Sequence, residues 1–181
     1  DIGAVVGEST YLESANEAEA SESAYWKYEL LIKRLESSLG SVVGGDGAIY
    51  AVRRELYQPM AADALSDFVN PCQVVMQGKR CIYEPAAVSV EEAAGSFEKE
   101  FRRKVRIVNR AWRAAMRLKK LLNPVKFGLF AFQFWSHKLL RWLVPVMLFG
   151  LVLSNVLLLH QGIVYRLIFL AQAFFYTLAF V

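Results

Sequence analysis

The sequence predicts an α/β domain that is followed by a membrane-embedded helical segment. Over the first two thirds of the chain, short apolar runs typical of strands alternate with segments whose apolar residues recur every three or four positions. A basic block then covers residues 99–126, and two long apolar stretches follow it. A chain of 181 residues could bury one modest core, but its apolar residues are too unevenly distributed for a single globular domain.

The first elements are predicted as strand, helix, loop and strand. Residues 2–6 form a short apolar run that is typical of a buried strand. Residues 25–39 carry apolar side chains at helical spacing, which places them on one face of a helix. Residues 41–46 form a glycine-rich loop that leads into a strand over residues 48–52. The helical face consists of Tyr25, Tyr28, Leu31, Ile32, Leu35 and Leu39.

A second helix is predicted from Ser66 to about Met76. Serine is a favourable N-cap residue, and Asp67 would then lie in the first turn, where the helix dipole favours a carboxylate. Pro71 lacks a backbone N–H and fits poorly inside a helix. We therefore expect this helix to begin late or to kink at the proline.

The next elements are two strands and a long basic helix. Residues 81–83 and 87–90 are predicted as short strands that Pro85 separates. Residues 96–122 have the pattern of a basic amphipathic helix, and residues 123–124, Asn-Pro, end it. Its apolar stripe consists of Phe97, Phe101, Val105, Val108, Trp112, Met116 and Leu121.

The last third of the chain predicts association with a membrane. Residues 123–142 combine aromatic and basic side chains, as in a helix that lies along lipid headgroups, and His137 is expected to be an interfacial polar residue. Residues 143–159 and 163–181 are the two predicted transmembrane helices. The basic block before them places the remaining part, residues 1–122, on the cytoplasmic side.

Composition also weighs against two other classes of protein. The net charge is only +4, and the aromatic residues lie in apolar runs instead of alternating with arginine, so no nucleic-acid partner is expected. Cys72 and Cys81 are the only cysteines, and they form neither a CxxC pair nor a metal-ligand spacing with histidine. Buried thiols in a reducing compartment are favoured over a disulfide or a zinc site.

Several motifs follow one another in a specific order. The strand sequence GAIYAVRR at residues 47–54 comes after Gly44-Gly45-Asp46, and SDFVNP at residues 66–71 follows it. Residues 78–85, GKRCIYEP, and residues 101–107, FRRKVRI, come next. In this order they resemble the membrane-bound family 2 glycosyltransferases, which include the cellulose, hyaluronan, chitin and poly-N-acetylglucosamine synthases. The resemblance covers nearly the whole chain.

This resemblance implies the C-terminal part of a Rossmann-like, GT-A type domain, then an interfacial helix and two transmembrane helices. It implies an inverting transfer from a nucleotide-sugar donor to a hydroxyl of a glycan or lipid-linked acceptor, in a multi-pass protein of the inner or plasma membrane. The family also uses a divalent cation, Mg²⁺ or Mn²⁺. No Asp-x-Asp motif occurs in the chain, so we expect its ligands upstream and this piece to be inactive alone.

The resemblance assigns the general base to Asp67. Inverting transfer needs one carboxylate to take the proton of the acceptor hydroxyl, and Asp67 stands where the family's acidic motif ends. The alternative is an acidic residue that only stabilises the helix dipole. The glycine-rich segment would border the acceptor channel, although a plain turn is the alternative for a glycine loop. Its site residues would be Gly45, Asp46, Gly47 and Ala48.

The basic helix supplies the last candidates. Arg106 matches the arginine of the family's Gln-x-x-Arg-Trp motif, which offsets charge on the leaving diphosphate, and Arg103 replaces the glutamine. Ile107 replaces the tryptophan that stacks on the acceptor sugar, which favours single transfer. Alternatively, these basic residues form a solvated or lipid-facing side. The rival functions are a processive polysaccharide synthase and a non-catalytic membrane scaffold.

Overall fold

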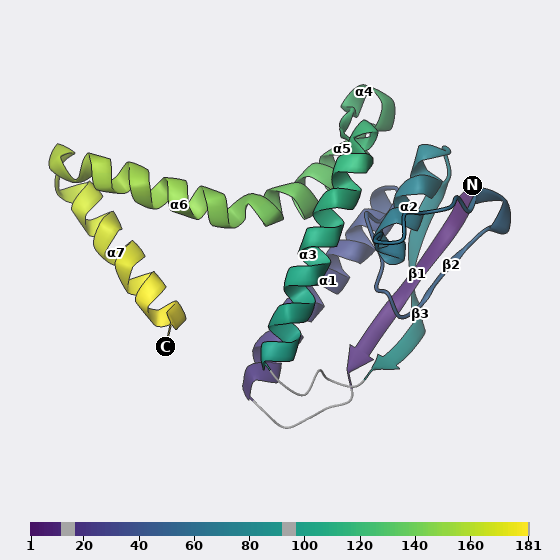
Figure 1. Cartoon of the computed structure of the whole chain (residues 1–181), viewed down its shortest axis with the longest axis horizontal. Coiled ribbons are helices and arrows are strands. Elements are labelled where there is room, and N and C mark those ends of the chain that lie inside the picture. Colours follow the sequence, from purple (N-terminus) through teal and green to yellow (C-terminus); the bar gives the residue numbers. More distant parts are fainter. Residues whose placement is uncertain (12–16, 92–96, 181) are drawn as a thin grey trace. The chain divides into compact units, whose positions relative to one another are not determined.

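A computed structural model describes residues 1–11, 17–91 and 97–180 and shows a mixed α/β fold. Its sheet has three strands in the order β2-β1-β3, with β1 (Ile2–Tyr11) in the centre (Figure 1). Strand β1 pairs antiparallel with β2 (Tyr50–Val52) and parallel with β3 (Arg80–Glu91). The predicted α/β class is therefore confirmed at this level.

One continuous strand, β3, replaces the two short strands that the sequence predicted around Pro85. Val6 of β1 pairs with Tyr83, whereas Glu8 pairs with Val88, so β3 contains extra residues between these two pairs. A proline cannot donate to a sheet ladder, and an irregularity of this kind accommodates it. Pro85 lies at this irregularity, and β3 continues past it. The prediction of two separate strands was wrong.

Helices and 3-10 turns complete the region up to residue 122. Helix α1 (Glu17–Leu39) contacts β3, and α2 (Ser66–Met76) contacts all three strands. The buried core comprises Ala4, Val6, Val42, Val74, Cys81 and Tyr83. Beyond it lie the 3-10 turn η1 (Arg54–Leu56), helix α3 (Phe97–Arg117) and the 3-10 turn η2 (Lys119–Leu122).

Helix α2 has the predicted bounds but not the predicted cap. The N-cap residue is Leu65, which makes no side-chain capping bond, and Ser66 is already helical. Asp67 lies in the first turn as predicted, and Pro71 lies inside the helix without delaying its start. The capping prediction for Ser66 was wrong. Asp67 is the acidic residue in the first turn, where the helix dipole favours its negative charge.

The predicted apolar face of α1 exists, but it is exposed. Tyr28 is 56% exposed and Leu39 is 64% exposed. Three of its charged residues, Glu29, Lys33 and Glu36, are buried instead. Helix α1 therefore packs through ionisable side chains, and these need partners in the interior.

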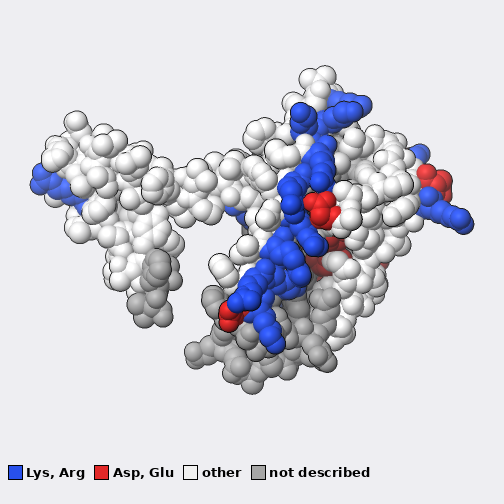
Figure 2. All heavy atoms as spheres, viewed as in Figure 1, with Lys and Arg blue, Asp and Glu red and all other residues white. Residues whose placement is uncertain are grey.

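Helix α3 also exposes its predicted apolar stripe. Phe101 is 58% exposed and Trp112 is 39% exposed, whereas Ala111, Ala114 and Ala115 are buried. Small side chains thus form the packed face. A continuous band of lysine and arginine runs along the helix beside it (Figure 2). This band consists of Arg102, Arg103, Lys104, Arg106, Arg110, Arg113 and Arg117.

The chain divides into two compact units, Asp1–Leu139 and Leu140–Val181. The first unit also contains α4 (Pro124–Phe127), α5 (Leu129–Gln133) and most of the π-helix η3 (Phe134–Leu140). In this segment Phe130, Phe134 and Leu139 are buried. The structure thus packs much of the predicted interfacial segment into the first unit.

The second unit is a pair of apolar helices. Helix α6 (Arg141–Leu158) leads through the turn η4 (Leu159–Gln161) to α7 (Ile163–Phe180). Among the described residues, the helical stretch Leu129–Gln161 is long and apolar enough to cross a membrane, and a shorter apolar helix, Ile163–Leu178, follows. The expected second span corresponds to this shorter helix.

Candidate acceptor site

The carboxylate of Asp67 lies beside the glycine loop of residues 44–47. A Cβ atom placed on Gly47 would be 4.0 Å from the Oδ2 atom of Asp67. The backbone N–H of Gly45 donates a hydrogen bond of 2.8 Å to the backbone carbonyl of Asp67. The first turn of α2 and the glycine loop are therefore joined directly.

Pro71 explains why this carbonyl is available. In an uninterrupted helix, the carbonyl of Asp67 would accept the N–H of the residue four positions later. That residue is Pro71, which has no N–H to give. The N–H of Gly45 takes its place. A residue that seemed unfavourable for the helix thus fixes the loop next to the candidate base.

The glycines of this loop are needed for close approach and not for positive φ angles. In the described residues, positive φ occurs only at Gly78, Gly128 and Gly162. A Cβ atom on Gly45, by contrast, would lie 2.7 Å from the Cγ1 atom of Val6 on β1. The loop therefore runs against the central strand at a distance that only glycine permits.

We expect Gly45→Ala to destabilise the first unit by about 1–3 kcal/mol, because the added methyl group must displace Val6 or the loop. Thermal unfolding of the detergent-solubilised chain measures this loss. Gly40→Ala is the matched control, since a Cβ atom there would meet nothing within 4 Å. Equal unfolding temperatures for the two variants would contradict the close-approach explanation.

Burial raises the pKa of the Asp67 carboxyl above its ordinary value. The nearby Asp46 raises this pKa further, whereas the backbone N–H groups of Asp67 and Phe68 and the ammonium group of Lys138 lower it. A carboxylate with a raised pKa is a stronger proton acceptor than a solvated aspartate. Perturbed carboxyl groups of this kind are frequent at catalytic sites.

Asp46 has a structural role in this loop. Its Oδ2 atom is 2.6 Å from the Nζ atom of Lys33 in an ion pair that is almost completely buried. The backbone N–H of Ser9 also donates to this oxygen, at 3.4 Å. Asp46 therefore ties the loop to α1 and β1, and Ala48 beside it is exposed. Sequence reasoning missed the role of Lys33, because its partner Asp46 lies in a distant loop.

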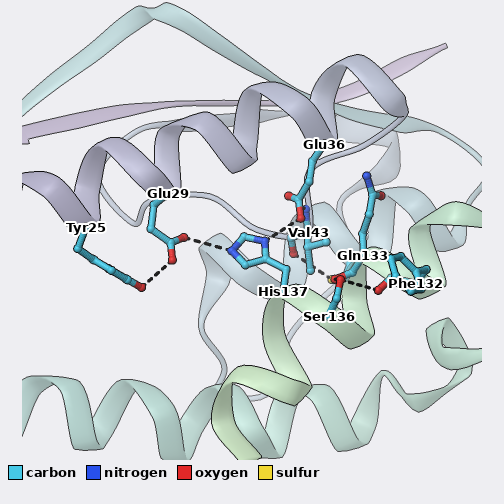
Figure 3. Close-up of polar contacts among 9 residues, drawn as sticks. Tyr25, Glu29, Glu36, Val43, Phe132, Gln133, Ser136 and His137 are labelled. Atoms are coloured by element: carbon cyan, nitrogen blue, oxygen red, sulfur yellow. Dashed lines mark hydrogen bonds and ion pairs between the residues drawn. The ribbon is translucent and has the colours of Figure 1, made fainter. Parts of the chain in front are cut away.

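A buried histidine lies between two carboxylates in the same unit (Figure 3). The Nδ1 atom of His137 is 2.7 Å from Oε1 of Glu36, and its Nε2 atom is 3.2 Å from Oε2 of Glu29. The three side chains are 6–9% exposed. Glu36 also accepts the N–H of Val43, and Glu29 accepts the hydroxyl of Tyr25. The prediction that His137 is an interfacial residue was wrong.

This arrangement, the His137 clasp of Glu29, Glu36 and His137, has a definite protonation requirement. A neutral imidazole has one donor and one acceptor nitrogen, whereas both of its partners here are carboxylates. In the clasp, each ring nitrogen of His137 therefore faces one carboxylate oxygen. Buried charged groups that are hydrogen-bonded in this way hold their elements together strongly.

The structure does not bring the basic candidates to Asp67. Arg106 is exposed on α3, and Arg103 is partly exposed there. Among the described residues, no hydrogen bond or ion pair joins Arg106 to Asp67. The arginines of α3 that reach α2's side of the unit are Arg113 and Arg117, which pair with Asp63. Asp67, Gly45, Asp46 and Gly47 thus gather, and Arg103 and Arg106 do not join them.

The described part of the chain offers no cluster of three or more histidine, cysteine or carboxylate side chains that could hold a metal ion. Asp46, the carboxylate nearest in the sequence to the glycine loop, is already paired with Lys33. The divalent cation that the resemblance implies therefore has no ligand set among these residues. The described residues do not fit that group.

Both cysteine thiols should be unreactive in the folded protein. Burial raises the pKa of the Cys81 thiol to about 12, and it raises that of Cys72 as well. The thiolate fraction near neutral pH is then negligible. We expect iodoacetamide at pH 8 to label neither residue in the native chain and both in denaturant, as measured by mass spectrometry. Native-state labelling at the denatured rate would contradict their burial.

The geometry as a whole provides one partly buried carboxylate with a raised pKa beside a glycine-rich loop. Such a site can remove a proton from a hydroxyl group that enters over the glycines. Comparison with protein-family models and with curated proteins finds no match. The functional assignment therefore depends on the residues and their geometry.

Proposed function

We propose that this chain carries the acceptor side of an inverting, membrane-bound glycosyltransferase, with Asp67 as the general base. The observation that supports this most is the Asp67 carboxylate, which is mostly removed from water, has a raised pKa and lies against the glycine loop. The order of motifs around it resembles that of the family 2 enzymes. The fold would then be the C-terminal part of a GT-A type domain.

In the proposed reaction, an acceptor hydroxyl lies over the glycine loop within reach of Asp67. The Asp67 carboxylate takes the hydroxyl proton while the acceptor oxygen forms a bond to the anomeric carbon of the donor sugar. The bond from that carbon to the nucleoside diphosphate breaks on the opposite face, so the configuration inverts. Gly47, which is exposed beside Asp67, would leave room for the acceptor because it carries no side chain.

The membrane is the second partner in this proposal. The exposed basic band and apolar stripe of α3 suit a surface of anionic headgroups. Helix α6, the part of the apolar stretch Leu129–Gln161 that follows the first unit, would then enter the bilayer. With basic residues preceding it, the first unit would lie on the cytoplasmic side of the inner or plasma membrane. The acceptor would be a glycan or a lipid-linked hydroxyl at that surface.

The proposal is tested in the product of the full reading frame, which we expect to include the donor-binding aspartates. Membranes that contain this protein are supplied with a panel of nucleotide sugars, and release of nucleoside diphosphate is measured. Release that depends on Asp67 supports the enzyme. Long glycan retained in the membrane fraction would identify the processive synthase among the transferases.

A non-catalytic scaffold is the second candidate function, and specific observations favour it. Ser66 replaces the first acid of the family's motif, and Arg106 is exposed on α3 without a bond to Asp67. A scaffold would release no nucleotide from any donor, with or without Asp67. The same assay therefore separates the two candidates.

A further inference from the structure

The segment that precedes the apolar helices packs against the start of α2. Phe134 is fully buried, and its ring lies 5.8 Å from that of Phe68 in a stacked arrangement. Phe68 is the residue directly after Asp67. Leu139, near the end of η3, is also buried. The π-helix η3 is therefore attached to the first turn of the helix that carries the candidate base.

This attachment brings Lys138 to the glycine loop. A Cβ atom placed on Gly44 would lie 3.7 Å from the Cε atom of Lys138 and 3.8 Å from the backbone carbonyl oxygen of Asp67. The lysine side chain thus extends along the same loop that borders Asp67. Burial raises the pKa of both Asp67 and Cys72 of α2, and the positive charge of Lys138 acts in the opposite direction on both groups.

The position of Lys138 is held by its neighbour in the chain. His137 is buried between Glu29 and Glu36 of α1, so the backbone next to Lys138 cannot shift without breaking two charged contacts. A π-helical turn is rare and is frequently found at functional sites. Here it directs consecutive residues to different partners, His137 to α1 and Lys138 to the loop beside α2.

We propose that Lys138 is a positioning residue for Asp67: the His137 clasp holds its side chain beside the glycine loop, where its positive charge favours the ionised form of the Asp67 carboxylate. The role of Asp67 as base, on which the catalytic part of this inference rests, is the proposed function above. The electrostatic effect of Lys138 on Asp67 does not depend on it.

The charges around Asp67 explain why a cation is needed there. Asp46 faces it from the loop and disfavours its ionisation, and burial acts in the same direction. Lys33 of α1 faces Asp46 and forms the buried ion pair with it. Lys138 is the lysine whose charge acts on Asp67 from η3. Without Lys138, burial and Asp46 would favour the protonated carboxyl group, which cannot act as a base.

The electrostatic effect of Lys138 on Asp67 is tested by carbodiimide labelling. Carbodiimide modifies protonated carboxyl groups, so the labelling depends on pH. The chain is labelled with carbodiimide and an amine across a pH series, and labelling of Asp67 is followed by mass spectrometry. We expect Lys138→Met to move the midpoint of Asp67 labelling upward by about one pH unit. Lys138→Arg, which keeps the charge, should restore the wild-type midpoint, and Lys126→Met on exposed α4 should leave it unchanged. A wild-type midpoint in Lys138→Met would overturn the inference.

Thermal unfolding shows whether the Lys138→Met chain folds. If it does not, Lys138→Gln, which retains a polar side chain, is used in the same test. The activity profile of the full reading-frame product gives an independent readout. In Lys138→Met its acidic limb should move upward with the labelling midpoint, and Lys138→Arg should restore it. If Asp67→Asn stays active while the labelling midpoint of Asp67 still shifts in Lys138→Met, the proposed function fails and the electrostatic effect of Lys138 on Asp67 holds. If Asp67→Asn is inactive and the labelling midpoint of Asp67 does not shift in Lys138→Met, the positioning role of Lys138 fails.

Discussion

Replacing Asp67 with asparagine should lower the rate of sugar transfer by about 10²–10⁴-fold, the usual contribution of a general base. Asparagine has nearly the same shape but cannot accept a proton from a hydroxyl group at neutral pH. The fold should survive, because the bond that anchors the glycine loop uses the backbone carbonyl of Asp67 and not its side chain. The measurement is nucleotide-sugar turnover in membranes that contain the full reading-frame product.

Asp63→Asn is the matched control for this substitution. Asp63 also carries a carboxylate close to α2, but it pairs with Arg113 at 3.3 Å and Arg117 at 2.9 Å on the exposed side of α3. Exposed ion pairs contribute little, so this variant should keep the wild-type rate. Equal rates for Asp67→Asn and Asp63→Asn would show that Asp67 is not the base.

The wild-type protein should also lose activity as the pH falls, starting at a higher pH than for an ordinary aspartate. Only the ionised carboxylate can take the proton, and burial raises the pKa of Asp67. The acidic limb of the activity profile therefore reports this raised pKa. The acidic limb of the activity profile and the lower transfer rate of Asp67→Asn should both result from the same carboxylate.

His137→Ala should destabilise the first unit by about 3–5 kcal/mol, the usual effect of removing one partner from a buried ionic group. Glu29 and Glu36 would be left buried near each other without the group that joins them. Segment η3 would then lose its main polar attachment to α1. Thermal unfolding of the detergent-solubilised chain measures the loss.

His160→Ala is the control for this prediction, because His160 is exposed in the turn η4. Its unfolding temperature should equal that of the wild type. Neutralising the carboxylates as well, in His137→Ala/Glu29→Gln/Glu36→Gln, should recover part of the lost stability, because coupled groups give non-additive effects. Unfolding of His137→Ala at the His160→Ala temperature would contradict the buried clasp.

Local patterns predicted the elements that carry the candidate site. Helix α2 has the expected bounds, Ser66–Met76, because a helix-favouring start and apolar spacing are both encoded nearby in the sequence. The sequence alone could not show that Asp67 lies beside Gly45 and Gly47; the family resemblance placed them in one site, and the structure places them close together. Pro71 was interpreted as an obstacle, since the sequence cannot show that a distant N–H replaces the one that proline lacks.

Periodicity predicted which residues share a helix face but not which face is buried. In α1, the apolar side chains of Tyr28 and Leu39 are exposed, and Lys33 is buried. The reason is tertiary, because Lys33 pairs with Asp46 in a loop and Glu36 pairs with His137, which is 101 positions away. Sequence spacing carries no information about such partners, so both the clasp and the position of Lys138 could be found only in the structure.

The central claim is that the Asp67 carboxylate receives the proton of an acceptor hydroxyl above the glycine loop. A structure of the full reading-frame product with a nucleoside diphosphate and its glycan product tests this most directly. We predict a carboxylate oxygen of Asp67 within about 2.6–3.2 Å of the terminal hydroxyl of that glycan. A glycan end bound elsewhere, with Asp67 making only contacts inside the protein, would contradict the claim.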